Sequence, residues 1–141
     1  MNGFQDQELI DSLVAADSSS WSVRAAAGRR LAAAPRLGAV ADVLHRLLLD
    51  VQDTAVTSET AVALLARGDL AGLRAVLAAR ADATDQGTAD QLGAELDGDP
   101  RWMTGDGLAE LIRQLQALAA DADPGVRDEA QRRLSLLRQD D

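Results

Sequence analysis

Few side chains in this sequence are of the types that carry out catalysis. The single histidine, His45, lies in an apolar helical pattern, with Asp42 three residues before it. A general base needs a pocket and an orienting partner, so we interpret His45 as a partly exposed helix residue. The run Ser18-Ser19-Ser20 lacks the Gly-x-Ser-x-Gly pattern of a nucleophile and is explained by a turn whose last serine begins a helix. We therefore predict no catalytic residue.

Metal and cofactor sites are not indicated either. The sequence has no cysteine, which excludes disulfides and cysteine-based zinc sites. Asp97, Asp99 and Asp106 lie close together, but they lack the Asp-x-Asp-x-Asp-Gly frame and the bidentate glutamate of a calcium loop. Gly105 and Gly107 follow no predicted strand, so they do not indicate a nucleotide-binding loop. We predict no metal and no cofactor.

The charge distribution carries more functional information. The 141-residue chain has 14 basic residues, all of them arginine, and 23 acidic residues, which give a net charge of −9. Residues 82–110 hold eight acidic residues and one arginine, a local net charge of −7. Residues 21–50 hold five arginines and two aspartates, a local net charge of +3. This polarity fits either a solvated surface or a surface that attracts a basic partner.

Charge and hydrophobicity argue against two other kinds of partner, nucleic acid and membranes. Binding to nucleic acid needs a basic surface, whereas the arginines at positions 24, 29, 30 and 36 lie on or just after one predicted helix. The first residues lack the basic and apolar regions of a signal peptide, and no stretch approaches 18 apolar residues. We expect a cytoplasmic protein that binds neither nucleic acid nor a membrane.

The elements that must position these residues are predicted to be helices. Alanine and leucine, both strong helix formers, dominate the apolar 47% of the chain, and aromatic residues make up 2%. Apolar residues follow Ser20, Asp53, Asp85 and Asp123 at helical spacing, and each of these four residues is a good N-cap. A further amphipathic stretch precedes each cap, at residues 7–16, 38–49, 70–81 and 108–120.

These paired stretches repeat along the chain. The caps are 33, 32 and 38 residues apart, and a period near 33 built of two helices is typical of an α-solenoid. We predict one all-α domain over residues 1–141, an α-solenoid of about four antiparallel helix pairs. The repeats cover approximately residues 5–36, 37–68, 69–98 and 104–139. The longer last interval predicts an insertion at residues 97–107.

The repeats resemble a known family. Residues 21–31, with the pair Val23-Arg24, resemble the second helix of a HEAT repeat. Residues 121–130 resemble another copy, with an Asp-x-Asp-Pro turn and the pair Val126-Arg127. The resemblance covers almost the whole chain, but it is weaker in the second repeat, where Thr57 replaces the arginine, and weakest in the third. The stretch from residue 53 to residue 73 is also similar to small actinobacterial HEAT-repeat proteins.

The resemblance has structural implications. In HEAT repeats a turn aspartate and the arginine of the Val-Arg pair form a ladder between neighbouring repeats. Arg24 and Arg127 are then the ladder arginines, with Asp17, Asp53 and Asp123 as acidic partners. The second helices of the repeats line the concave face. The repeat register places these residues on it: Ala25, Ala26, Arg29, Ser58, Glu59, Val62, Asp90, Gln91, Ala94, Asp128, Glu129 and Arg132.

The resemblance also implies a function, because HEAT proteins are mostly binding scaffolds. We expect a monomeric, non-enzymatic protein-binding module. It would hold a basic protein on its concave face and acidic third repeat, and its most concrete form is an immunity or antitoxin-type protein. A scaffold or regulatory adaptor is the alternative, ahead of a HEAT-type lyase or a nucleic-acid-binding protein. Trp102 is either a binding hot spot or a plug between repeats. The predicted partner-binding residues are Arg29, Glu59, Asp90, Glu95, Asp97, Asp99, Trp102 and Asp106.

Overall fold

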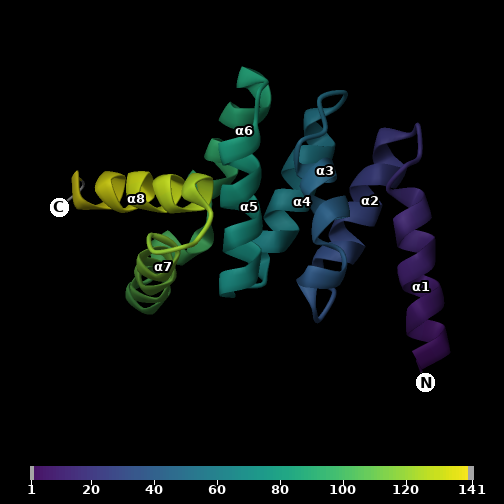
Figure 1. Ribbon diagram of the computed structural model, residues 1–141, viewed down its shortest axis with the longest axis horizontal. Helices are drawn as coiled ribbons and strands as arrows, with labels where there is room; N and C mark the ends of the chain where they lie inside the picture. Colours follow the sequence, from purple (N-terminus) through teal and green to yellow (C-terminus); the bar gives the residue numbers. More distant parts are fainter. Residues whose placement is uncertain (1, 140–141) are drawn as a thin grey trace.

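The computed structural model describes residues 2–139, with side chains for residues 7–101 and 103–137. All regular elements in this part of the chain are helical, as the sequence predicts (Figure 1). The α-helices are α1 (Asn2–Ala15), α2 (Trp21–Ala32), α3 (Ala41–Leu48), α4 (Thr54–Ala66), α5 (Leu70–Asp82), α6 (Gln86–Asp97), α7 (Gly105–Leu118) and α8 (Pro124–Gln139). Two short 3₁₀ helices, η1 (Leu37–Ala39) and η2 (Pro100–Met103), precede α3 and α7.

The second helix of each pair begins directly after its predicted N-cap. Asp53, Asp85 and Asp123 each accept a hydrogen bond from a backbone N–H of the first turn, at 2.8–2.9 Å. These bonds satisfy donors that have no partner within the helix. Ser20 stands at the same place before α2, but its side chain accepts no bond from a backbone N–H of the first turn and instead bonds to the hydroxyl of Ser22 at 3.0 Å.

The first three helix pairs form a row. The loops within these pairs lie along one edge of the molecule, at the top of Figure 1. Helix α4 packs between α2 and α6, and α3 packs on α5. The contact between α2 and α4 is close, because a Cβ atom at Gly28 would lie 2.1 Å from Oγ1 of Thr60. A glycine at position 28 is therefore needed for these two helices to approach.

The fourth pair departs from this row. Helix α8 packs mainly on α5 and α7, and in Figure 1 it runs across the direction of α5. Two salt bridges connect α5 to the fourth pair of helices: Arg80 with Glu129 at 2.7 Å, and Arg74 with Asp121 at 2.8 Å. The prediction that Glu129 lies on an open concave face is therefore wrong, because its carboxylate is bound to α5. The connection that allows this turn contains η2, inside the predicted insertion.

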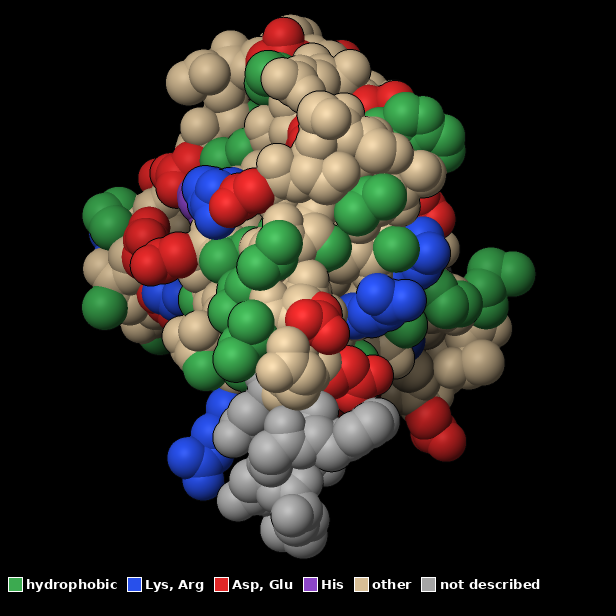
Figure 2. All heavy atoms as spheres, turned by 90° about the vertical axis from the view of Figure 1, so that its right-hand side faces the viewer, with side chains coloured by type: hydrophobic (Ala, Val, Ile, Leu, Met, Phe, Trp, Pro, Cys, Tyr) green, Lys and Arg blue, Asp and Glu red, His purple; other side chains and the backbone are tan. Residues whose placement is uncertain are grey.

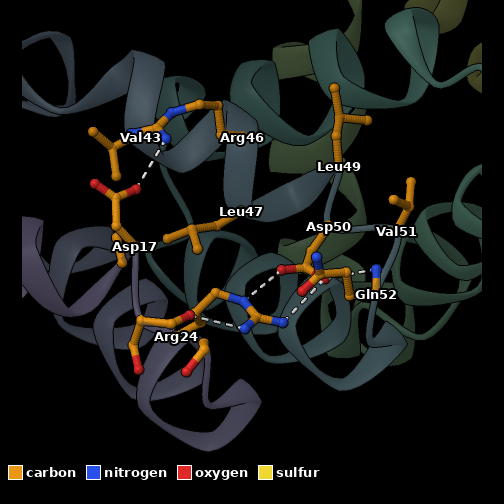
Figure 3. Close-up of a pocket in the computed structure, with 12 residues that line it drawn as sticks. Asp17, Arg24, Val43, Arg46, Leu47, Leu49, Asp50, Val51 and Gln52 are labelled. Carbon is orange, nitrogen blue, oxygen red and sulfur yellow. Dashed lines mark hydrogen bonds and ion pairs between the residues drawn. The ribbon is translucent and has the colours of Figure 1, made fainter.

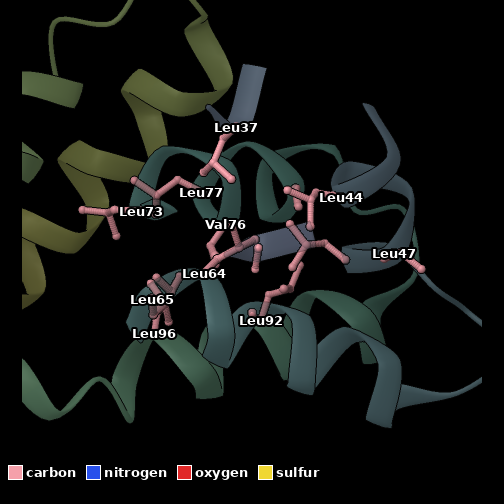
Figure 4. Packing of buried hydrophobic residues seen from close by; sticks show 14 of the residues in the cluster. Leu37, Leu44, Leu47, Leu64, Leu65, Leu73, Val76, Leu77, Leu92 and Leu96 are labelled. Carbon is pink, nitrogen blue, oxygen red and sulfur yellow. The ribbon is translucent and has the colours of Figure 1, made fainter. Parts of the chain in front are cut away.

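The core is made of aliphatic side chains. Leucine, valine and alanine fill it, and the described core contains no aromatic side chain (Figure 4). Small residues such as Ala27 and Ala61 are completely buried between the helices, which brings the backbones close together. Trp21, by contrast, is half-exposed at the start of α2. No helix in the described part of the chain is long and apolar enough to cross a membrane.

Candidate functional site

Polar contacts connect the exposed sides of α2, α4 and α6. Arg29 of α2 pairs with Glu59 of α4, and both side chains are partly exposed. Ser58 of α4 donates a hydrogen bond to Glu95 of α6 at 2.7 Å. The half-exposed Val62 lies one turn further along α4. Arg29 and Glu59, both predicted on the concave face, thus share a polar surface with Glu95, which was predicted as a partner-binding residue. Ala25, also predicted on the concave face, is buried and contributes nothing to this surface.

Two of the three carboxylates of α6, those of Asp90 and Glu95, are oriented by neutral donors. Asp90 is exposed and accepts a hydrogen bond from the amide of Gln86 at 2.8 Å. Glu95 accepts hydrogen bonds from Ser58 and from the amide of Gln91, the latter at 2.9 Å. Helix α6 contains no arginine. An amide or a hydroxyl orients a carboxylate without cancelling its charge, so both residues keep their negative charge at the surface.

Two other predicted binding residues are occupied by structural contacts. Asp99 is buried, and its carboxylate pairs with Arg101 at 2.8 Å. Asp97 remains exposed but pairs at 2.5 Å with Arg133 of α8, whose side chain is buried. The assignment of Asp99 to a binding surface is therefore wrong, because a partner cannot reach it. Asp97 belongs to the junction between α6 and α8.

The remaining predicted residues lie around η2 and the start of α7. Asp106 is exposed in the first turn of α7, where a negative charge interacts favourably with the helix dipole. The side chain of Trp102 lies outside the described residues, so its predicted role stays a prediction.

Arg24, the first predicted ladder arginine, is buried between the first two helix pairs. Its Nε atom donates to Asp50 at 2.8 Å, and its Nη1 atom donates to the carbonyl oxygen of Ser18 at 2.9 Å. The acidic partner is therefore Asp50 rather than Asp17 or Asp53. Asp53 is engaged as the N-cap of α4, and Asp17 pairs with Arg46 at 3.1 Å.

Arg127, the second predicted ladder arginine, makes a local contact. Its Nη1 atom donates to the carbonyl oxygen of Asp121 at 3.2 Å, while Asp123 caps α8. The carboxylate of Asp121 pairs with Arg74 of α5. The hydrogen bond from Arg74 and a second one from the backbone of Asp123 lower the pKa of Asp121 to about 2. In the second pair, Thr57 replaces the arginine and donates to the carbonyl oxygen of Asp50.

An open hollow of about 480 Å³ lies between the loops of the first two pairs. Figure 3 shows Leu47 on its wall, between the pair formed by Asp17 and Arg46 and the pair formed by Arg24 and Asp50. The oxygen atoms of Asp50 are already used, since one accepts from Arg24 and the other from two backbone N–H groups. The hollow therefore offers no free charge at its base.

The single histidine is also part of a structural contact. Nε2 of His45 lies 3.0 Å from the carboxylate of Asp82, which joins α3 to the end of α5. The described residues include no group of three or more histidine or acidic side chains placed to hold a metal ion.

Comparisons with known proteins found no match to this chain among protein families, curated proteins or solved structures.

Proposed function

We propose that this chain is a protein-binding module without enzymatic activity, built as a solenoid of four HEAT-like helix pairs in which the last pair is turned. The spacing of the helix pairs and the row formed by α2, α4 and α6 support this architecture. The partner is a basic protein, and an immunity or antitoxin-type protein that neutralises a basic toxin in the cytoplasm is the most concrete form of this proposal.

The observation that carries the proposal is the uncompensated charge on α6. Asp90 and Glu95 are five residues apart, a rise of about 7.5 Å along a helix. Five residues also turn a helix by about 140°, so the two carboxylates point to different sides of α6. Both contribute negative charge to this part of the surface, which would attract a cationic surface. Two other carboxylates of residues 82–110, those of Asp97 and Glu110, pair with arginine side chains.

The immobilised chain would first be used to capture proteins from its native host, and the captured protein would then be purified. Neutralising both carboxylates in the variant D90N/E95Q should lower the association rate for this protein about tenfold. The same change should flatten the dependence of the affinity on salt, because both effects come from the removed charges. Each substitution keeps the side-chain shape and one acceptor oxygen. One oxygen of each side chain accepts the bonds from Gln86, Ser58 and Gln91, so the fold should be unaffected.

The matched control is D42N, which removes an exposed carboxylate from α3. This variant should bind like the wild type. Equal affinity of D90N/E95Q and the wild type at low salt would rule out α6 as the binding surface. Capture of an acidic protein alone would rule out the basic partner.

A scaffold or adaptor role is the second candidate. The exposed side of α2 and α4 is nearly neutral, since Arg29 and Glu59 compensate each other beside the half-exposed Val62. A surface of this kind suits a partner that binds without strong charge. In that case, the affinity would be insensitive to salt and would fall in the variant V62S.

A further inference from the structure

Helix α1 has two stripes with the same helical spacing. Positions i, i+3, i+4 and i+7 lie on one side of a helix. Leu9, Ser12, Leu13 and Ala16 form one such stripe, which is at least partly buried and packs on α2. Gln7, Ile10, Asp11 and Val14 form the other, here called the outer stripe, and all four are exposed. Exposed fractions of 52% for Ile10 and 70% for Val14 are high for aliphatic side chains.

The neighbouring helix α2 also exposes an aliphatic side chain, that of Val23. Helices α2 and α4 start 33 residues apart, so Val23 is the counterpart of Val56. Val56 is completely buried, and Thr60, one turn further on, contacts α2 at Gly28. Val23 is 41% exposed because no helix precedes α2 at that place in the row. The outer stripe and Val23 therefore leave aliphatic surface uncovered at this end of the molecule.

The negative charge at this end of the molecule indicates which kind of partner could cover the exposed aliphatic side chains. Residues 7–23 contain Glu8, Asp11 and Asp17 and no basic residue. Asp17 pairs with Arg46, whereas Glu8 and Asp11 form no ion pair with any described residue. Asp11 accepts only the amide of Gln7, at 2.9 Å. Figure 2, which looks onto this end, shows hydrophobic side chains among charged ones above the grey residues.

We infer that the outer stripe is a docking site for an amphipathic helix of a partner, with an aliphatic ridge flanked by lysine or arginine. The ridge packs on Ile10 and Val14, and the flanking cations pair with Glu8 and Asp11. A second copy of this chain fits less well, because a symmetric contact through α1 would bring the acidic residues of both copies together. The inference rests on the proposed function for the sign of the partner's charge. The contact that it adds is at α1, at the other end of the row of helix pairs from α6.

The test uses the full chain and two synthetic peptides of equal length and equal lysine content. One peptide has leucines at helical spacing, and the other has the same composition in scrambled order. Fluorescence anisotropy of a label on the peptide should show at least tenfold tighter binding of the amphipathic peptide. The variant I10S/V14S should lose this preference, and E8Q/D11N should weaken binding of both peptides.

Two controls separate the outcomes. The variant L136S removes an exposed aliphatic side chain from α8 and should bind like the wild type, as should D42N, which removes an exposed carboxylate from α3. Circular dichroism checks that I10S/V14S remains folded. Unchanged peptide binding by I10S/V14S would overturn the proposal. A mass above the 14.8 kDa of one chain in light scattering, lost in I10S/V14S, would also overturn it, because a second copy would then cover the stripe. Loss of binding in D90N/E95Q alone would assign the peptide to α6.

Discussion

Replacing Arg24 by methionine should destabilise the protein by about 3–5 kcal/mol, which is the usual cost of leaving one member of a buried ion pair without its partner. The side chains of Arg24 and Asp50 are 8% and 10% exposed, so solvent screens the interaction only weakly. The substitution R24M also removes the bond to the carbonyl oxygen of Ser18. For a chain of this length the melting temperature should fall by roughly 10 °C or more.

Thermal unfolding followed by circular dichroism measures this effect, and a double-mutant cycle isolates the pair. The double variant R24M/D50N should lose much less stability than the sum of R24M and D50N, because it leaves no uncompensated charge. The control is R113Q, which breaks the exposed pair with Glu110 and should cost no more than about 0.5 kcal/mol. A loss below about 1 kcal/mol in R24M, or strict additivity in the cycle, would refute the reasoning.

Two further predictions concern the helix contacts. The variant G28A should destabilise the fold by about 1–3 kcal/mol, because its Cβ atom would lie 2.1 Å from Oγ1 of Thr60. Chemical denaturation should show that G28A/T60A recovers part of the lost stability. An unchanged stability of G28A would contradict the close contact. The pKa of Asp121 is about 2 in the folded protein, below the ordinary 3.8, so its contribution to stability is fully present above about pH 4 and is lost as the pH falls through 2. Carboxyl NMR titration should show this pKa rising toward 3.8 in R74Q, and an unchanged value would exclude Arg74 as the main cause.

Local features of the fold could be predicted from the sequence. The four second helices begin after the predicted caps. In three of them the cap forms the expected bond, which depends on a side chain and a backbone N–H only two or three residues apart. The four predicted first-helix stretches also correspond to α1, α3, α5 and α7, since their apolar spacing is decided within one helix. The insertion was predicted from the longer interval, and η2 lies inside it.

Contacts between distant residues could not be predicted in the same way. The partner of Arg24 was expected among Asp17 and Asp53, but Asp50 lies nearer in space. One signal was present, because Asp50 precedes its cap by three residues, as Asp17 does in the first repeat. Sequence reasoning also missed the pair of Arg80 with Glu129, whose members are 49 residues apart and meet only because α8 crosses α5.

The candidate binding surface was likewise predictable in part from the sequence and decided in part by the tertiary structure. The sequence alone determined that the acidic residues are concentrated between positions 82 and 110 and that this segment is mostly helical, since both depend on composition and local spacing. Only the tertiary structure decided which carboxylates remain available: Asp99 became buried, Asp97 met Arg133, and Asp90 and Glu95 stayed away from arginine side chains. A carboxylate's effective charge depends on which cations the packing of helices brings near it, and this proximity is a property of the folded chain.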